Sequence, residues 1–127
     1  MRTILLFIFL FISNLAFSQE MFLGKTTDEI KYSIPSSKSY IMTINNYQAI
    51  CQIVDTNITD IYCFNHQGIC IEYKRLFSNI TPDILKQFLS DYFDTGDIWI
   101  DNSKGLIAMV KQKSSTLIEV SIRKKEY

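Results

Sequence analysis

The three cysteines and the single histidine of this chain fall in one stretch, at Cys51, Cys63, His66 and Cys70. Thiolate and imidazole ligands in this combination are those of a Cys3His zinc site. The segment Asn65-His66-Gln67-Gly68 is, however, typical of a hairpin turn, which would aim the flanking thiols away from a common centre. We therefore expect no metal here and interpret His66 as a solvated turn residue.

The same stretch offers little for nucleophilic catalysis. A serine or cysteine nucleophile needs a neighbouring base, and His66 is the only histidine that would serve. The tip of a hairpin provides no pocket that excludes water. We expect no catalytic residue and no cofactor.

The cysteines also pose the question of a disulfide, because such bonds form in exported proteins. In the predicted hairpin Cys63 and Cys70 point to opposite faces and cannot bridge, whereas Cys51 on a neighbouring strand would meet either of them. Each cysteine also fits a strand as a small buried apolar residue. Free thiols are the favoured interpretation, and a disulfide is the alternative.

A second group of polar residues surrounds the turn at residues 95–96, and its acidic members are Asp91, Asp94, Asp97 and Asp101. Carboxylates bind calcium and perform acid and base catalysis without histidine. Their spacing matches no calcium loop, and aspartate is also favoured at helix ends and turns. Trp99 either packs in the core or offers a stacking surface. We keep Asp94, Asp97, Trp99 and Asp101 as a candidate ligand or partner surface.

The first residues predict an exported protein. Met1-Arg2 gives a positive start, residues 4–12 are an unbroken apolar run, and Ala16-Phe17-Ser18 places small residues where signal peptidase cuts. We expect a signal peptide at 1–18 and a single domain at 19–127. Because the run is too short for a permanent span, we expect a periplasmic or secreted protein with no stable membrane insertion after cleavage.

Charge excludes one class of partner. The chain has 13 basic and 13 acidic residues, and loss of Arg2 with the signal peptide leaves a formal charge of −1. A near-neutral surface has no field that attracts a phosphate backbone. We expect no nucleic acid partner, and we consider another envelope or extracellular protein instead.

The first half of the chain predicts a helix followed by strands. Thr26 can cap a helix and Glu29 can reach back to it, while Pro35 ends the helix after barely two turns. A short strand at 40–44 and β-branched, aromatic runs at 49–54, 60–65 and 69–77 then follow. The turn would pair Phe64 with Cys70. The face that we expect in the core carries Ile61, Cys63, Ile69, Ile71 and Tyr73.

The second half repeats the layout. Thr81-Pro82-Asp83 predicts a helix start with a capping hydroxyl, and residues 95–96 would end that helix. Its apolar stripe comprises Ile84, Leu85, Phe88, Leu89 and Tyr92. Strands are expected at 97–100, 106–111 and 116–123. Phe88, at the centre of the stripe, should be buried against the face carrying Ile118, Val120 and Ile122.

These elements predict an α+β fold. The order α-βββ-α-βββ is met most simply by an antiparallel sheet of about five to six strands with two helices packed on one face.

The segment at 22–30 (FLGKTTDEI), a glycine and a capped short helix before the strands, resembles the opening of the small outer-membrane-assembly lipoproteins and of β-lactamase-inhibitor-protein-like domains. That resemblance covers about the first half of the mature chain and implies helices on an antiparallel sheet and binding to other proteins. The lipidation cysteine of such lipoproteins is missing, because residues 19–21 are Gln-Glu-Met. Tyr62-x-Phe64 with Gly68-x-Cys70, the second helix and Trp99 resemble small secreted bacterial proteins of unassigned function.

The leading functional hypothesis is an exported, non-catalytic binding or protein-interaction module. The alternative is a small periplasmic hydrolase or metal-binding protein that uses the acidic segment at 91–101.

Overall fold

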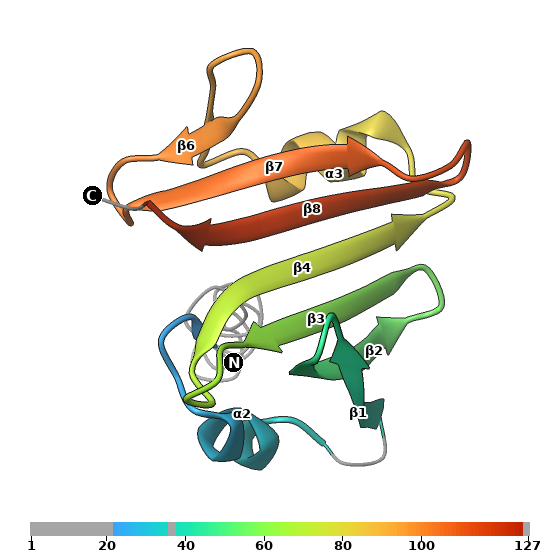
Figure 1. The fold of residues 1–127 in the computed structure, drawn as a ribbon. Coiled ribbons are helices and arrows are strands. Elements are labelled where there is room, and N and C mark those ends of the chain that lie inside the picture. Colours follow the sequence, from blue (N-terminus) through green and yellow to red (C-terminus); the bar gives the residue numbers. More distant parts are fainter. Residues whose placement is uncertain (1–21, 36–37, 126–127) are drawn as a thin grey trace, which may run out of the picture.

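The chain forms one eight-stranded antiparallel sheet and two helices (Figure 1). The computed structural model describes residues 22–35 and 38–125. In chain order the elements are α2 (Thr27–Ser33), β1 (Ser39–Ile44), β2 (Tyr47–Asp55), β3 (Ile58–Phe64), β4 (Cys70–Ser78), α3 (Pro82–Phe88), β5 (Phe93–Asp94), β6 (Trp99–Asp101), β7 (Leu106–Gln112) and β8 (Leu117–Lys124). The strands lie side by side in the order β1-β2-β3-β4-β8-β7-β6-β5. The sheet is therefore open, with β1 and β5 at its edges.

The predicted α+β class and the antiparallel sheet with two helices are confirmed, but the predicted strand number is wrong. The sheet has eight strands in the order α-ββββ-α-ββββ, instead of five to six. The two additional strands are β1, which corresponds to the short strand expected at 40–44 but left out of the predicted order, and β5, a two-residue segment that the sequence placed inside a helix.

The predicted signal peptide lies outside the described residues and stays a prediction. Within the part of the chain that the structure describes, no helix combines the length and the apolar character needed to cross a membrane.

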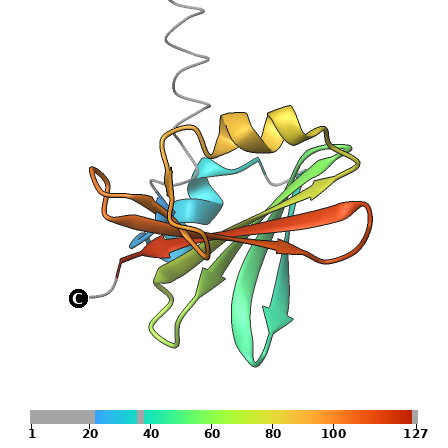
Figure 2. The same ribbon diagram turned by 90° about the horizontal axis from the view of Figure 1, so that it is seen from above.

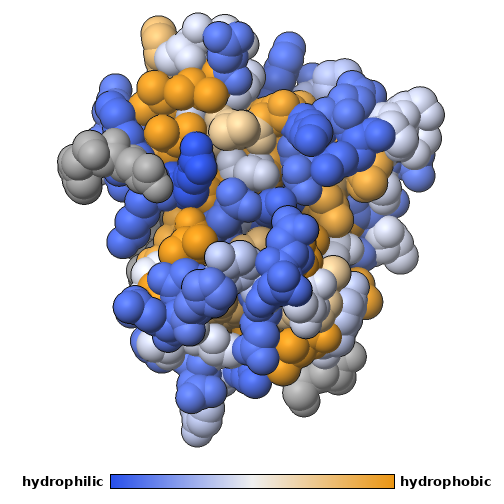
Figure 3. Space-filling model, viewed as in Figure 1, coloured by the Kyte–Doolittle hydropathy of each residue, from blue (hydrophilic) through white to orange (hydrophobic). Residues whose placement is uncertain are grey.

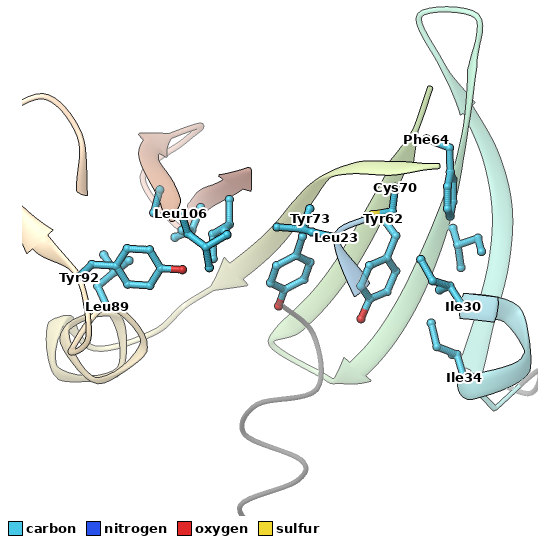
Figure 4. Packing of buried hydrophobic residues seen from close by; sticks show 14 of the residues in the cluster. Leu23, Ile30, Ile34, Tyr62, Phe64, Cys70, Tyr73, Leu89, Tyr92 and Leu106 are labelled. Carbon is cyan, nitrogen blue, oxygen red and sulfur yellow. The ribbon is translucent and has the colours of Figure 1, made fainter. Parts of the chain in front are cut away.

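Both helices lie on the same side of the twisted sheet (Figure 2). The main core fills the space between them and the sheet (Figure 4). α2 begins as predicted: the Glu29 amide donates to the Thr26 hydroxyl at 3.3 Å, and the Thr26 amide donates to the Glu29 carboxylate at 3.3 Å. The helix has only seven residues, so burial of Ile30 and Ile34 must hold it in place.

The second helix is shorter than predicted. α3 ends at Phe88, and Leu89 is its C-cap, so Tyr92 lies beyond the helix and not in its last turn. Thr81 occupies the N-cap position, but its hydroxyl makes no capping hydrogen bond. Leu89 and Tyr92 are buried in the core, whereas Phe88 is only half-buried. Phe88 packs against the main core but keeps part of its surface exposed, so the prediction that it is the buried centre of the stripe is wrong.

The predicted hairpin between β3 and β4 is confirmed at its turn. Phe64 pairs with Cys70, the Gly68 amide donates to the Asn65 carbonyl at 3.0 Å, and Gly68 has a φ of 75°. This left-handed conformation is one that glycine adopts without strain.

The predicted core face of that hairpin is wrong, because the pairing contains a β-bulge. Phe64 pairs with Cys70 but Cys63 pairs with Glu72, which leaves one extra residue on β4. The bulge brings both Cys70 and Tyr73 to the helix-covered face. Of the residues predicted for the core face, Tyr73 alone belongs to the main core. Ile61 and Cys63 lie in a separate cluster, Ile69 is half-buried, and Ile71 is exposed.

Candidate functional site on the open face of the sheet

The structure separates the residues of the considered zinc site. Cys70 lies in the helix-covered core, whereas Cys51 and Cys63 belong to a small apolar cluster of β1 to β4. His66 is exposed at the hairpin turn, where its ring lies 4.5 Å from the ring of Tyr47. Among the residues that the structure describes, no three His, Cys, Asp or Glu side chains are grouped to hold a metal ion. All three cysteines are free thiols.

Burial makes the thiols weak nucleophiles. It raises the pKa of Cys63 to about 11 and that of Cys70 to about 12. Because the thiolate is the reacting species, alkylation of Cys63 by iodoacetamide should be very slow at pH 7 and should accelerate about tenfold per pH unit up to about pH 10. Mass spectrometry of the native protein over this pH range measures the rate. A plateau near pH 8 would contradict the expected pKa.

The four acidic residues of the 91–101 segment have different surroundings and do not share one site. Asp91 and Asp97 are exposed. Asp94 accepts a hydrogen bond from the Gly96 amide at 2.8 Å and so stabilises a turn. Asp101 is buried, and one of its oxygens accepts from the Ser103 hydroxyl at 2.6 Å and the Lys104 amide at 3.1 Å. These hydrogen bonds, that from Ser103 above all, hold the pKa of Asp101 below its usual value.

Trp99 lies on the helix-covered side of β6. It pairs with Ala108, and its half-buried side chain packs against the main core. Trp99 pairs with Asp94 across β5 and β6, so these two residues lie on the same face of the sheet. Asp97 lies in the loop between the two strands, and Asp101 is buried.

The main core contains a buried ionic cluster that the sequence analysis does not predict. Asp60 on β3 is fully buried and pairs with Arg75 on β4, whose Nε and Nη2 donate to its two oxygens at 2.7 and 2.8 Å. The Tyr73 hydroxyl donates to the same carboxylate at 2.8 Å. The guanidinium also lies 5.1 Å from the ring centroid of Phe88 on α3. This cluster joins two strands and a helix, so we interpret it as structural.

The sheet face opposite the helices is open, and it has a hollow. Figure 3 views this face and shows hydrophobic surface between hydrophilic side chains. The hollow has a volume of about 660 Å³ and lies across β2, β3, β4 and the end of β8. At one end it reaches the edge of the main core, where Leu23, Phe64 and Cys70 line it. Its lining includes Tyr47, Ala49, Cys63, Ile71, Lys74 and Arg123. Except for Cys63, these residues are not predicted as a site, because they come from four strands that only the folded sheet brings together.

Comparison with models of protein families, with curated proteins and with solved structures found no match to this chain. The resemblance to outer-membrane-assembly lipoproteins and β-lactamase-inhibitor-protein-like domains therefore stays an expectation from the sequence.

Proposed function

We propose that the protein is an exported, non-catalytic binding module whose ligand occupies the hollow of the open face. The observation that carries this proposal is the hollow itself, which combines apolar side chains with a few charged groups on the face that the helices leave uncovered. Its volume of about 660 Å³ lies in the range of small-molecule sites. Export is supported by the signal-like residues 1–18.

The chemistry of the hollow favours binding over catalysis. Cys63, which lines it, has a raised pKa and is therefore a poor nucleophile at neutral pH. His66, which also lines it, sits at an exposed turn where water has access. The alternative of a hydrolase or metal protein built on residues 91–101 has less support, because two of the four aspartates there bind turn backbones and the other two are exposed.

A fragment screen followed by amide chemical shifts tests the proposal. We expect the perturbed amides to cluster at Tyr47, Cys63 and Ile71. Ile71 is 52% exposed at the hollow, so Ile71→Glu should keep the fold and abolish these shifts. Phe93→Glu is the matched control, because Phe93 is 70% exposed and does not line the hollow. Hits that scatter over the surface, or that Phe93→Glu removes equally, would show that the hollow is not the site.

A further inference from the structure

The two edges of the sheet differ in how they are protected against pairing with another chain. An edge strand presents unpaired N–H and C=O groups, and natural edge strands are usually short, charged, bulged or covered. β5 fits this pattern, because it has two residues and one of them is Asp94. β1, at the opposite edge (Figure 1), has six residues and pairs with β2 from Ser39 to Ile44 without a bulge. Within the described chain its outer side is a regular ladder edge that pairs with no other strand.

The composition of β1 gives no protection either. Its residues are SYIMTI, and it is the only one of the eight described strands without a charged side chain. Tyr40 projects to the open face, where it pairs with Cys51, and Ile41 projects to the helix-covered face, where it pairs with Ile50. Tyr40 and Ile41 are both exposed. Apolar surface therefore lies on both sides of this edge.

The hairpin of β1 and β2 determines which backbone groups of β1 point outward. The two residues of its loop, Asn45 and Asn46, have φ angles of 51° and 69°, which are typical of a type I′ turn. The pair that closes such a turn, here Ile44 and Tyr47, is hydrogen-bonded, and bonded and non-bonded pairs then alternate along the ladder. The backbone groups that face away from β2 are those of Ser39, Ile41 and Thr43.

We propose that β1 pairs with β1 of a second copy of this chain, antiparallel and across a two-fold axis at Ile41. In this register Ile41 lies opposite Ile41 of the second copy, and Ser39 lies opposite Thr43. All outward backbone groups of both strands are then hydrogen-bonded. The two sheets become one continuous sheet with the helices of both copies on the same face. This surface is distinct from the hollow, so the inference goes beyond the proposed function.

Charge and symmetry favour a second copy over a strand of another protein. β1 offers no charge that would select a partner of opposite charge, and two copies of it meet without repulsion between their strands. An antiparallel pair of identical strands is self-complementary, as a two-fold interface requires. Tyr40 lies opposite Met42 of the second copy on the open face, which gives a contact between a ring and a thioether. Because β5 is too short to accept another strand, association stops at two copies.

Sedimentation equilibrium of the purified protein over micromolar to millimolar concentration tests the dimer. Ile41→Lys places two like charges opposite each other at the two-fold axis, so it should raise the Kd of the dimer more than about tenfold. Ile84→Lys is the matched control, because it adds the same charge at an exposed isoleucine of α3 and should leave the Kd unchanged. A parent protein that stays monomeric, or an equal loss in the two variants, would overturn the inference.

A second variant changes the backbone of β1 instead of its charge. Thr43→Pro removes an N–H group that faces away from β2, so the hairpin keeps its hydrogen bonds while the dimer loses two of its own. We expect the far-UV circular dichroism of the parent and a Kd raised about tenfold or more. A folded Thr43→Pro variant that dimerises as tightly as the parent would mean that another surface forms the dimer.

Amide hydrogen exchange tests the register and the occupant. The amides that should become protected as the protein concentration rises are those of Ser39, Ile41 and Thr43. The intervening amides bond to β2 in both states, so their protection should change little. A dimer without this alternation contradicts the proposed pairing. If the protein stays monomeric and an uncharged extended peptide protects the same three amides, the edge binds another protein and the second copy is wrong.

Discussion

Arg75→Met should destabilise the protein by about 3 to 5 kcal/mol, the usual cost of removing one partner from a buried ion pair. Asp60 has no exposed surface, and Arg75 supplies a donor to each of its oxygens. In the variant only the Tyr73 hydroxyl would still donate to the carboxylate. Urea unfolding at pH 7, compared with the parent protein, measures the loss of free energy.

A neighbouring ion pair provides the control for Arg75→Met. Lys74 lies on the opposite face of β4 from Arg75, and its ion pairs with Glu72 and Glu119 are partly exposed. Lys74→Met should therefore cost about 1 kcal/mol or less. The triple variant Asp60→Leu, Tyr73→Phe and Arg75→Met leaves no polar group of the cluster unpaired and should recover most of the lost stability. Equal midpoints for Arg75→Met and the parent would mean that Asp60 is not buried as a charged group.

The buried pair also shows where local sequence patterns no longer predict the pairing of β3 with β4. The turn at residues 65–68 correctly predicts that Phe64 pairs with Cys70. A regular ladder continued from that pair places Asp60 opposite Lys74. The bulge moves every later pair by one residue, so Asp60 meets Arg75 and Tyr62 meets Tyr73. No turn residue signals this shift, because its benefit comes from ion pairing and aromatic packing in the assembled core.

The sequence predicts structure that depends on neighbouring residues better than it predicts contacts between distant segments. The α2 start depends on Thr26 and Glu29, which are three residues apart, and it was predicted correctly. The hollow depends on how four strands are arranged, and part of its lining comes from β8, far along the chain from Ala49. Residues such as Arg123 resemble any solvated strand residue in the sequence. Only the folded sheet brings them beside apolar side chains.

Leu89→Ala should cost about 2 to 5 kcal/mol, because it removes a side chain that fastens the end of α3 to the sheet. Leu89 is 1% exposed and lies in the same core cluster as Val120 and Ile122 of β8. The seven-residue helix is too short to be stable by itself, so its position depends on such contacts. Thermal and urea unfolding of the variant measure the loss.

Two other apolar residues of α3 make this prediction specific to burial. Ile84 is 40% exposed, so Ile84→Ala should cost about 1 kcal/mol or less. Phe88 is half-buried, with its ring 5.3 Å from that of Phe77, so Phe88→Ala should fall between Ile84→Ala and the cost of truncating a fully buried phenylalanine, which is about 3 to 5 kcal/mol. A loss for Ile84→Ala as large as that for Leu89→Ala would mean that α3 presents its other side to the sheet.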